Sequence, residues 1–178
     1  MTKVLAASLA TLLLTAAAAA PSPGTITITG KQMGTPVTGQ FKNFTAHIQF
    51  DPAKPAASKA MIEVDTASID IGLEDFNQEL RSKTWFDSKS HPKATFVAST
   101  IKASAAERME ASGKLTIKGT TREVTFPVAV KSEGTTRVFE GAVPIRRTEF
   151  NVGEGEWKAT DTVADEVQIR FRLLVPVK

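Results

Sequence analysis

Hydrophobic and polar side chains alternate with a period of two along the C-terminal end of the chain. One parity is polar or charged from residue 166 to residue 172. The other parity is apolar throughout: Val167, Ile169, Phe171, Leu173, Val175 and Val177. Because successive side chains of a strand point to opposite faces, this pattern predicts a long strand with one buried face.

The same alternation recurs upstream and predicts further strands. Its two clearest runs of apolar positions are Val124, Phe126, Val128 and Val130, and Phe44, Ala46, Ile48 and Phe50. Shorter runs lie at residues 26–28, 62–64, 115–117 and 139–145. Turn-forming sequences separate the runs: Lys42-Asn43, residues 51–55, residues 118–121, residues 132–134 and residues 153–155. The chain is therefore expected to form roughly seven to nine antiparallel strands.

One segment follows a helical period instead. Leu73, Phe76 and Leu80 are spaced as one face of a short helix, and charged or amide residues occupy the other positions. We predict a helix over residues 73–83, followed directly by Trp85 and Phe86. A short helix between strands suits a cap over one end of an antiparallel barrel or sandwich.

The strand pattern indicates an all-β fold and favours a barrel. A sheet that is buried on one face must protect its edges, and closing it into a barrel removes them. Eight strands enclose either packed side chains or one slender ligand, and periodicity does not separate a dry core from an apolar tunnel. A sandwich is the competing architecture. A barrel that crosses an outer membrane would need aromatic girdles, and the chain has no tyrosine.

The first 20 residues have the composition of a secretory signal peptide. Lys3 precedes an apolar run from Val4 to Leu14, and an alanine-rich stretch follows up to Ala20. A membrane anchor is the alternative, but the 17 residues from Val4 to Ala20 reach only the lower limit of a membrane span. We predict a cleaved signal at residues 1–20, one mature domain at residues 21–178, and a periplasmic location.

Composition argues against most catalytic and metal chemistry. The chain has no cysteine, so disulfides and thiolate chemistry are excluded, and its histidines, His47 and His91, have no partner at metal-ligand spacing. The formal net charge of +3 is spread along the sequence and does not indicate a nucleic-acid partner. We expect no catalytic residue, no metal and no cofactor. The carboxylates of Asp161, Asp165 and Glu166 are interpreted as solvated loop charges.

Several arginines are candidates for binding an anionic head group. They are Arg81, Arg146, Arg147, Arg170 and Arg172. Arginines on the outward parity of strands more often make a surface soluble, and this is our interpretation of the last four. Arg81 is the preferred head-group candidate because it follows the apolar face of the predicted helix, with an ion pair to a loop acid as the alternative.

A series of segments in the right order resembles the YceI-like family of polyisoprenoid-binding periplasmic proteins. The segments are Ser68-Ile69-Asp70, Leu80-Arg81-Ser82, Trp85-Phe86-Asp87, residues 91–96, residues 113–119, residues 124–128, residues 145–147 and the closing pattern from Phe150 to Val167. The resemblance covers nearly the whole mature chain. It implies an extended eight-stranded antiparallel lipocalin-like barrel with a short helical cap near one mouth and an elongated apolar cavity.

The resemblance and the strand parity together predict the ligand-binding residues. We expect the cavity wall to include Phe41, Phe44, Ile48, Phe96, Phe126, Phe171 and Leu173. We expect the mouth to be closed by Phe76, Leu80, Trp85 and Phe86, with Arg81 at the head group. For each of these residues, a plain role in the core is the alternative.

Two classes of function follow. The leading hypothesis is a periplasmic carrier that binds a long isoprenoid, a quinone-like lipid or a related amphiphile as a monomer or homodimer. The alternative is an enzyme that acts on such a lipid, or a stress-related scaffold without a ligand. Lys31-Gln32-Met33-Gly34 replaces the Lys-His pair of many relatives, and this resembles a branch found beside membrane b-type cytochromes. The branch favours a quinone-related ligand and transient contact with the membrane or with such a cytochrome.

Overall fold

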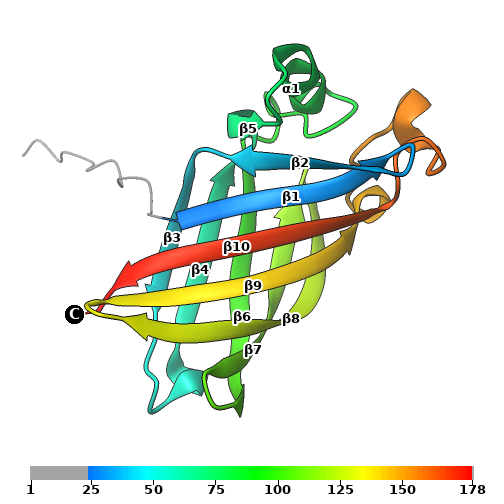
Figure 1. Ribbon diagram of the computed structural model, residues 1–178. Coiled ribbons are helices and arrows are strands. Elements are labelled where there is room, and N and C mark those ends of the chain that lie inside the picture. Colours follow the sequence, from blue (N-terminus) through cyan, green and yellow to red (C-terminus); the bar gives the residue numbers. More distant parts are fainter. Residues whose placement is uncertain (1–23, 178) are drawn as a thin grey trace, which may run out of the picture.

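The computed structural model describes residues 24–177, in which one antiparallel sheet curls around an apolar interior and carries a single α-helix (Figure 1). The predicted signal peptide lies outside these residues. The strands are β1 (Gly24–Gln32), β2 (Thr35–Phe41), β3 (Phe44–Gln49), β4 (Lys59–Asp65), β5 (Ile69–Asp70), β6 (Lys93–Ala105), β7 (Arg108–Ile117), β8 (Thr120–Glu133), β9 (Thr136–Arg146) and β10 (Glu166–Pro176). The helices are α1 (Glu74–Arg81) and the 3-10 turns η1 (Pro55–Ala57), η2 (Thr66–Ser68), η3 (Arg147–Phe150) and η4 (Gly155–Lys158).

The sheet has the order β3-β4-β6-β7-β8-β9-β10-β1-β2-β5. Strands β6 to β10 follow one another as antiparallel neighbours, and β10 pairs with β1 from Gly24↔Leu173 to Thr29↔Gln168. The two-residue turn between β7 and β8 shows how the sequence sets this pattern. Lys118 and Gly119 both have positive φ, at 47° and 73°, as a tight hairpin requires. The predicted all-β antiparallel class is confirmed.

The predicted count of eight strands is wrong, because two strands are broken at a shared bend. Strand β3 forms one edge of the sheet and β2 lies beside the other edge, yet only Lys42 and Asn43 separate them in the chain. Strands β4 and β5 are interrupted in the same place by η2. Backbone hydrogen bonds from Lys42 to Ser68 (3.1 Å) and from Asp65 to Asn43 (3.0 Å) hold the two bends together. The chain thus turns a corner of the curled sheet here, and the ten strands occupy the positions of eight.

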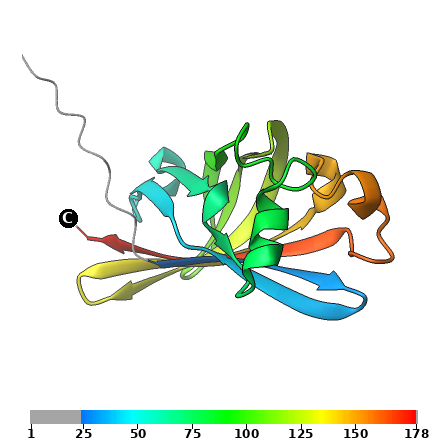
Figure 2. The same ribbon diagram turned by 90° about the horizontal axis from the view of Figure 1, so that it is seen from above.

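The curled sheet has two halves that cross each other. Strands β9, β10, β1 and β2 form one wall, and β3, β4, β6 and β7 run across it (Figures 1 and 2). The apolar parity of both halves faces the space between them. Buried members of this core include Ile69 on β5 and Phe139 on β9. This arrangement encloses an elongated interior along the sheet.

Helix α1 lies over one end of the sheet, as predicted, but it presents a different face to the interior (Figure 1). Leu73 and Phe76 are 58% and 45% exposed, whereas Asn77 is 4% exposed. The Asn77 Oδ1 accepts a hydrogen bond from the Ile71 amide at 2.8 Å, and its Nδ2 donates to Asp70 at 3.2 Å. These bonds satisfy the buried amide and fix the rotation of the helix. No helix within residues 24–177 is long and apolar enough to cross a membrane.

Gly141 on β9 leaves room for the ring of its cross-strand neighbour Phe171. A Cβ at this position would collide with that ring and would lie 2.9 Å from the carbonyl oxygen of Pro127. We therefore expect Gly141→Ala to lower the free energy of unfolding by about 1–3 kcal/mol, as overpacking does in other cores. Urea denaturation measures this change.

Gly30→Ala on β1 is the matched control. A Cβ there would meet only the Val167 side chain, at an ordinary contact distance of 3.7 Å. We expect this variant to be as stable as the wild type or slightly more stable, since alanine restricts the unfolded chain. Equal stability of the two variants would contradict the close packing of Phe171 on Gly141.

Candidate functional site

The two halves of the sheet enclose a cavity of about 200 Å³. Inward-facing side chains of β1 to β4 and β6 to β10 form its wall, and residues 80–86 close the end below α1. The wall is apolar: among its side chains only Thr95, Trp85 and Arg147 carry a polar atom. The volume exceeds the roughly 150 Å³ that holds a benzene-sized guest and is smaller than the roughly 300 Å³ of a typical small-molecule site. The cavity therefore fits a slender apolar guest.

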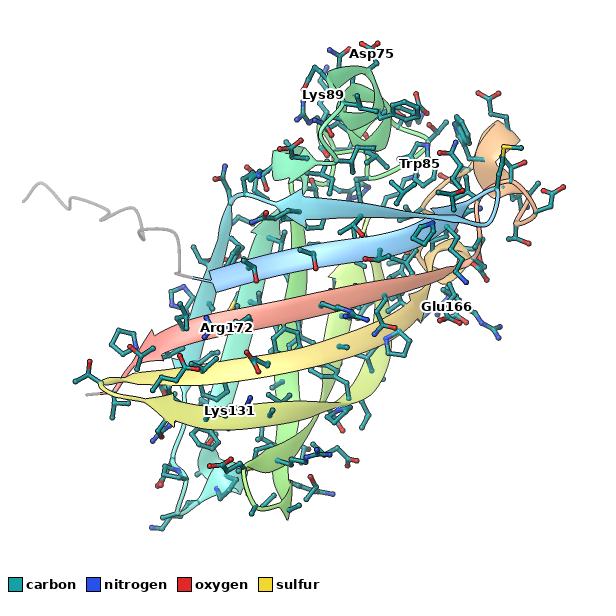
Figure 3. The ribbon with its side chains drawn as sticks, in the orientation of Figure 1. Asp75, Trp85, Lys89, Lys131, Glu166 and Arg172 are labelled. Atoms are coloured by element: carbon teal, nitrogen blue, oxygen red, sulfur yellow. The ribbon has the colours of Figure 1, made fainter. Side chains whose placement is uncertain are left out.

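Most of the residues predicted for the ligand site lie in this wall. They are Phe41, Ile48, Leu80, Trp85, Phe86, Phe96, Phe126, Phe171 and Leu173. The inward parity predicted for β10 is confirmed, and Arg172 lies on its outer face (Figure 3). There Arg172 forms ion pairs with Glu140 and Glu133 at 3.0 and 3.1 Å. Burial in the wall is what the structure establishes for these nine residues, and their contact with a ligand stays a prediction.

Three predicted residues lie elsewhere. Phe44 follows the bend at Lys42-Asn43 directly and packs in the core instead of the cavity wall. Phe76 does not close the mouth, because the hydrogen bonds of Asn77 turn its ring toward solvent. Arg81 is also outside the wall: its Nη1 donates to Glu74 at 3.0 Å and its Nη2 to the carbonyl of Ile69 at 3.3 Å.

Aromatic rings line the length of the cavity. Phe126 lies in the middle of a row, with its ring centroid 5.2 Å from that of Phe96 and 5.8 Å from that of Phe171. At the end farthest from α1, Phe50 and Phe139 meet edge to face at 5.4 Å. These separations are typical of favourable aromatic pairs. The rings give the cavity firm walls that do not depend on hydrogen bonds.

The end below α1 is closed by two segments that bind each other. The amides of Gly153 and Glu154 both donate to the carbonyl of Thr84, at 2.9 and 2.8 Å. The indole N–H of Trp157 donates to Glu79 on α1 at 3.0 Å. The rings of Trp157 and Trp85 lie 5.7 Å apart. The loop after η3 and the segment after α1 thus form one closing layer.

Arg147 holds this loop from the inside and is 2% exposed. Its three nitrogens donate to six carbonyl oxygens, at 2.7 to 3.3 Å: those of Val152, Gly153, Trp157, Ala159, Val163 and Ala164. Desolvation lowers the pKa of Arg147 from its ordinary value, while the charge of Asp165 opposes the shift. The interpretation of Arg147 as an outward arginine that makes the surface soluble is therefore wrong. The sequence could have indicated this burial, because Arg147 continues the inward parity of Val143 and Ile145 one residue beyond the end of β9.

Asp165, a half-buried carboxylate of the loop, also anchors the start of β10 to the same structure, which is a role that the sequence analysis did not predict. Its carboxylate accepts hydrogen bonds from the Thr148 amide (3.0 Å) and hydroxyl (2.7 Å). Burial alone would raise the pKa of Asp165. The hydrogen bonds from Thr148 and the charges of Arg147 and Arg146 outweigh that effect, and the pKa lies below its ordinary value of 3.8. The charged form is thus favoured in the folded protein.

The described residues offer little for metal chemistry. Within residues 24–177 no three histidine, aspartate or glutamate side chains gather as a metal site would require. His47 is exposed on the outer face of β3, in a shallow depression that also contains an ion pair between Lys93 and Glu63 at 3.0 Å. The apolar cavity is the candidate functional site.

The comparisons with known proteins agree with this geometry. The model of the YceI-like domain matches residues 18–175. A UPF0312 protein of Pseudomonas putida is 33% identical over 98 residues, which cover 55% of this chain and 51% of that protein. A UPF0312 protein of Ectopseudomonas mendocina is 28% identical over 131 residues, covering 70% of this chain and 69% of that protein. The chain spans about half the length of the first of these relatives.

Solved structures share the fold. The crystal structure of Burkholderia cenocepacia BcnA has a TM-score of 0.84 and 47% sequence identity, covering 85% of this chain and 96% of that one. A polyisoprenoid binding domain from Saccharophagus degradans, implicated in plant cell wall breakdown, has a TM-score of 0.71 at 14% identity and covers 89% of this chain and 96% of that one. At this low identity the second likeness concerns the fold alone.

Replacing the buried guanidinium tests its structural role. Arg147→Met keeps much of the side-chain volume but leaves six carbonyl oxygens without their donor. A buried polar group without a partner costs roughly 1–3 kcal/mol, so we expect a loss of about 3 kcal/mol or more in the free energy of unfolding. Arg146→Met, at the exposed neighbour, should change stability by less than about 0.5 kcal/mol. Similar losses in both variants would contradict the role assigned to Arg147.

The lowered pKa of Asp165 predicts a dependence of stability on pH. A carboxylate whose folded pKa lies below its unfolded value stabilises the fold above the unfolded value, and the contribution is lost as the pH falls through the folded value. We expect the wild type to lose more stability than Asp165→Asn between about pH 5 and pH 2. Thermal denaturation across this range, with Asp161→Asn as the exposed control, measures the difference. Parallel curves for wild type and Asp165→Asn would refute it.

Proposed function

The chain belongs to the YceI-like domain family, and from this premise we propose that it binds the apolar chain of an isoprenoid or a related amphiphile in its cavity. The observation that carries the proposal is the wall itself. It combines a partly enclosed space of about 200 Å³ with a nearly unbroken apolar lining. Such a space does not favour water, because a buried water needs polar partners.

The free energy of such binding comes from removing the ligand's chain from water. Burial contributes about 25 cal/mol per Å² of apolar surface, or about 0.8 kcal/mol for each methylene. Rings along the wall, such as those of Phe96, Phe126 and Phe171, supply contact without requiring a particular sequence of polar groups in the guest. The lining therefore selects for a long, slender and apolar chain.

The finer role that we propose is that of a periplasmic carrier or store. A long amphiphile can leave a membrane only if its chain is buried elsewhere, and an enclosed cavity provides that burial. The polyisoprenoid binding domain of similar fold supports a branched isoprenoid chain as the natural cargo, with a quinone-like lipid included in this class. Binding of this kind involves no bond breaking, and the apolar wall presents no acid, base or nucleophile for it.

A charge placed inside the cavity should abolish binding. We expect Phe171→Arg to retain no lipid, because the guanidinium would lie in the apolar wall and would lose its hydration. Arg172→Ala is the matched control on the outer face of the same strand and should retain as much lipid as the wild type. The measurement is native mass spectrometry of protein exported by its own host, followed by extraction and identification of the lipid.

A second variant guards against misfolding of Phe171→Arg. Ala98→Leu keeps the wall apolar but fills part of the cavity, and we expect a reduced lipid content with an unchanged circular dichroism spectrum. Wild-type protein that is consistently empty, and that takes up no isoprenoid lipid when incubated with it, would overturn the proposal.

A further inference from the structure

Three buried polar atoms without a hydrogen-bond partner are clustered in one short segment of the described chain. They are the Nε of Arg81, the Nε1 of Trp85 and the Oγ of Ser88, all between the end of α1 and the start of β6. Buried polar groups are normally satisfied, and Arg147 nearby uses all three of its nitrogens. The shortage of partners is thus specific to the segment that closes the cavity.

Trp85 is the member of this group that also lines the cavity. Within the closing layer, the centre of its ring lies 5.7 Å from that of Trp157 and 5.7 Å from the guanidinium carbon of Arg147. The chain has two tryptophans, and they differ in one respect. The indole N–H of Trp157 donates to Glu79, whereas the buried indole N–H of Trp85 has no acceptor.

We propose that the indole N–H of Trp85 donates a hydrogen bond to the head group of the bound amphiphile. This inference rests on the proposed function and adds the chemistry and the orientation of the ligand. An indole can only donate, so the head group must present an acceptor oxygen, either the carbonyl of a quinone or the oxygen of a phosphate. The positive charge of Arg147 close to the same ring favours an oxygen that carries negative charge.

The orientation of the ligand follows from the two ends of the cavity. The side chain of Trp85, with its unpaired indole N–H, borders the end below α1. The pair Phe50 and Phe139 borders the opposite end, where the guanidinium of Arg137 lies over the Phe50 ring and already donates to the Phe50 carbonyl. The head group therefore lies below α1, and the chain extends past Phe126 toward Phe50.

The test compares Trp85→Phe with Trp157→Phe, using ligands that share one chain. The probes are phytanyl phosphate, a naphthoquinone bearing the phytanyl chain, and phytane, which has the same saturated chain and no head group. Phenylalanine keeps an aromatic ring but removes the N–H. We expect Trp85→Phe to weaken binding of a head-group ligand about fivefold to tenfold, the effect of one lost hydrogen bond, and to leave phytane binding unchanged. Trp157→Phe should affect all three ligands alike.

A spectroscopic readout separates the hydrogen bond from general effects on packing. In ¹⁵N-labelled wild-type protein, the indole resonance that is absent from Trp85→Phe should move downfield when a head-group ligand is added and should move less with phytane. A response to the quinone alone or to the phosphate alone identifies which acceptor the site prefers.

The outcomes distinguish this inference from the proposed function. If wild-type protein binds none of the probes, the proposed function fails. If it binds them but Trp85→Phe weakens phytane and the head-group ligands equally, lipid binding stands and the role of Trp85 is refuted. An indole resonance of Trp85 that does not respond to either head group would also refute the role of Trp85.

Discussion

The closed end of the molecule depends on one buried cation. The six carbonyl oxygens that Arg147 binds come from residues 152–164, a segment with few apolar side chains and only two short 3-10 turns around it. Such a segment has little burial of its own to offset the entropy of ordering it. A planar guanidinium with five N–H donors can order a loop that hydrophobic contacts cannot. The cavity has a defined end because this loop is fixed against Thr84 and α1.

The rest of the enclosure follows from a sheet that bends sharply in one place. Where β2 passes into β3, the chain turns from one wall to the other, and the hydrogen bonds between Lys42, Asn43, Asp65 and Ser68 keep both bent strands in register. Without this corner the two walls would be parts of an open, twisted sheet with an exposed apolar face. The bend therefore places the two walls of the cavity against each other, and the buried cation fixes the loop that closes one end.

The sequence pattern was informative wherever a strand alternates strongly, and weak wherever hydrogen bonds decide the outcome. Parity correctly placed Phe126, Phe171 and Leu173 in the wall. It did not reveal β6, whose alanines, serines and threonines suit either face, or β2, which contains Pro36 and Gly39. For α1, hydrophobic spacing selected Phe76 as an inward residue. The network around Asn77 determined the rotation instead, and no periodicity encodes such a network.

A cavity in a protein interior lowers the stability of the fold when no guest occupies it. Residual cavity volume destabilises a protein by about 24 cal/mol per Å³, so a space of about 200 Å³ corresponds to roughly 5 kcal/mol relative to a filled core. The small side chains of Ala60, Ala94, Ala98 and Ala111 keep it open, and larger apolar residues in their place would fill it. A chain inside the cavity would restore the lost contacts and so stabilise the fold. The same apolar contacts are therefore expected to determine both the affinity for the ligand and the gain in stability when the ligand binds.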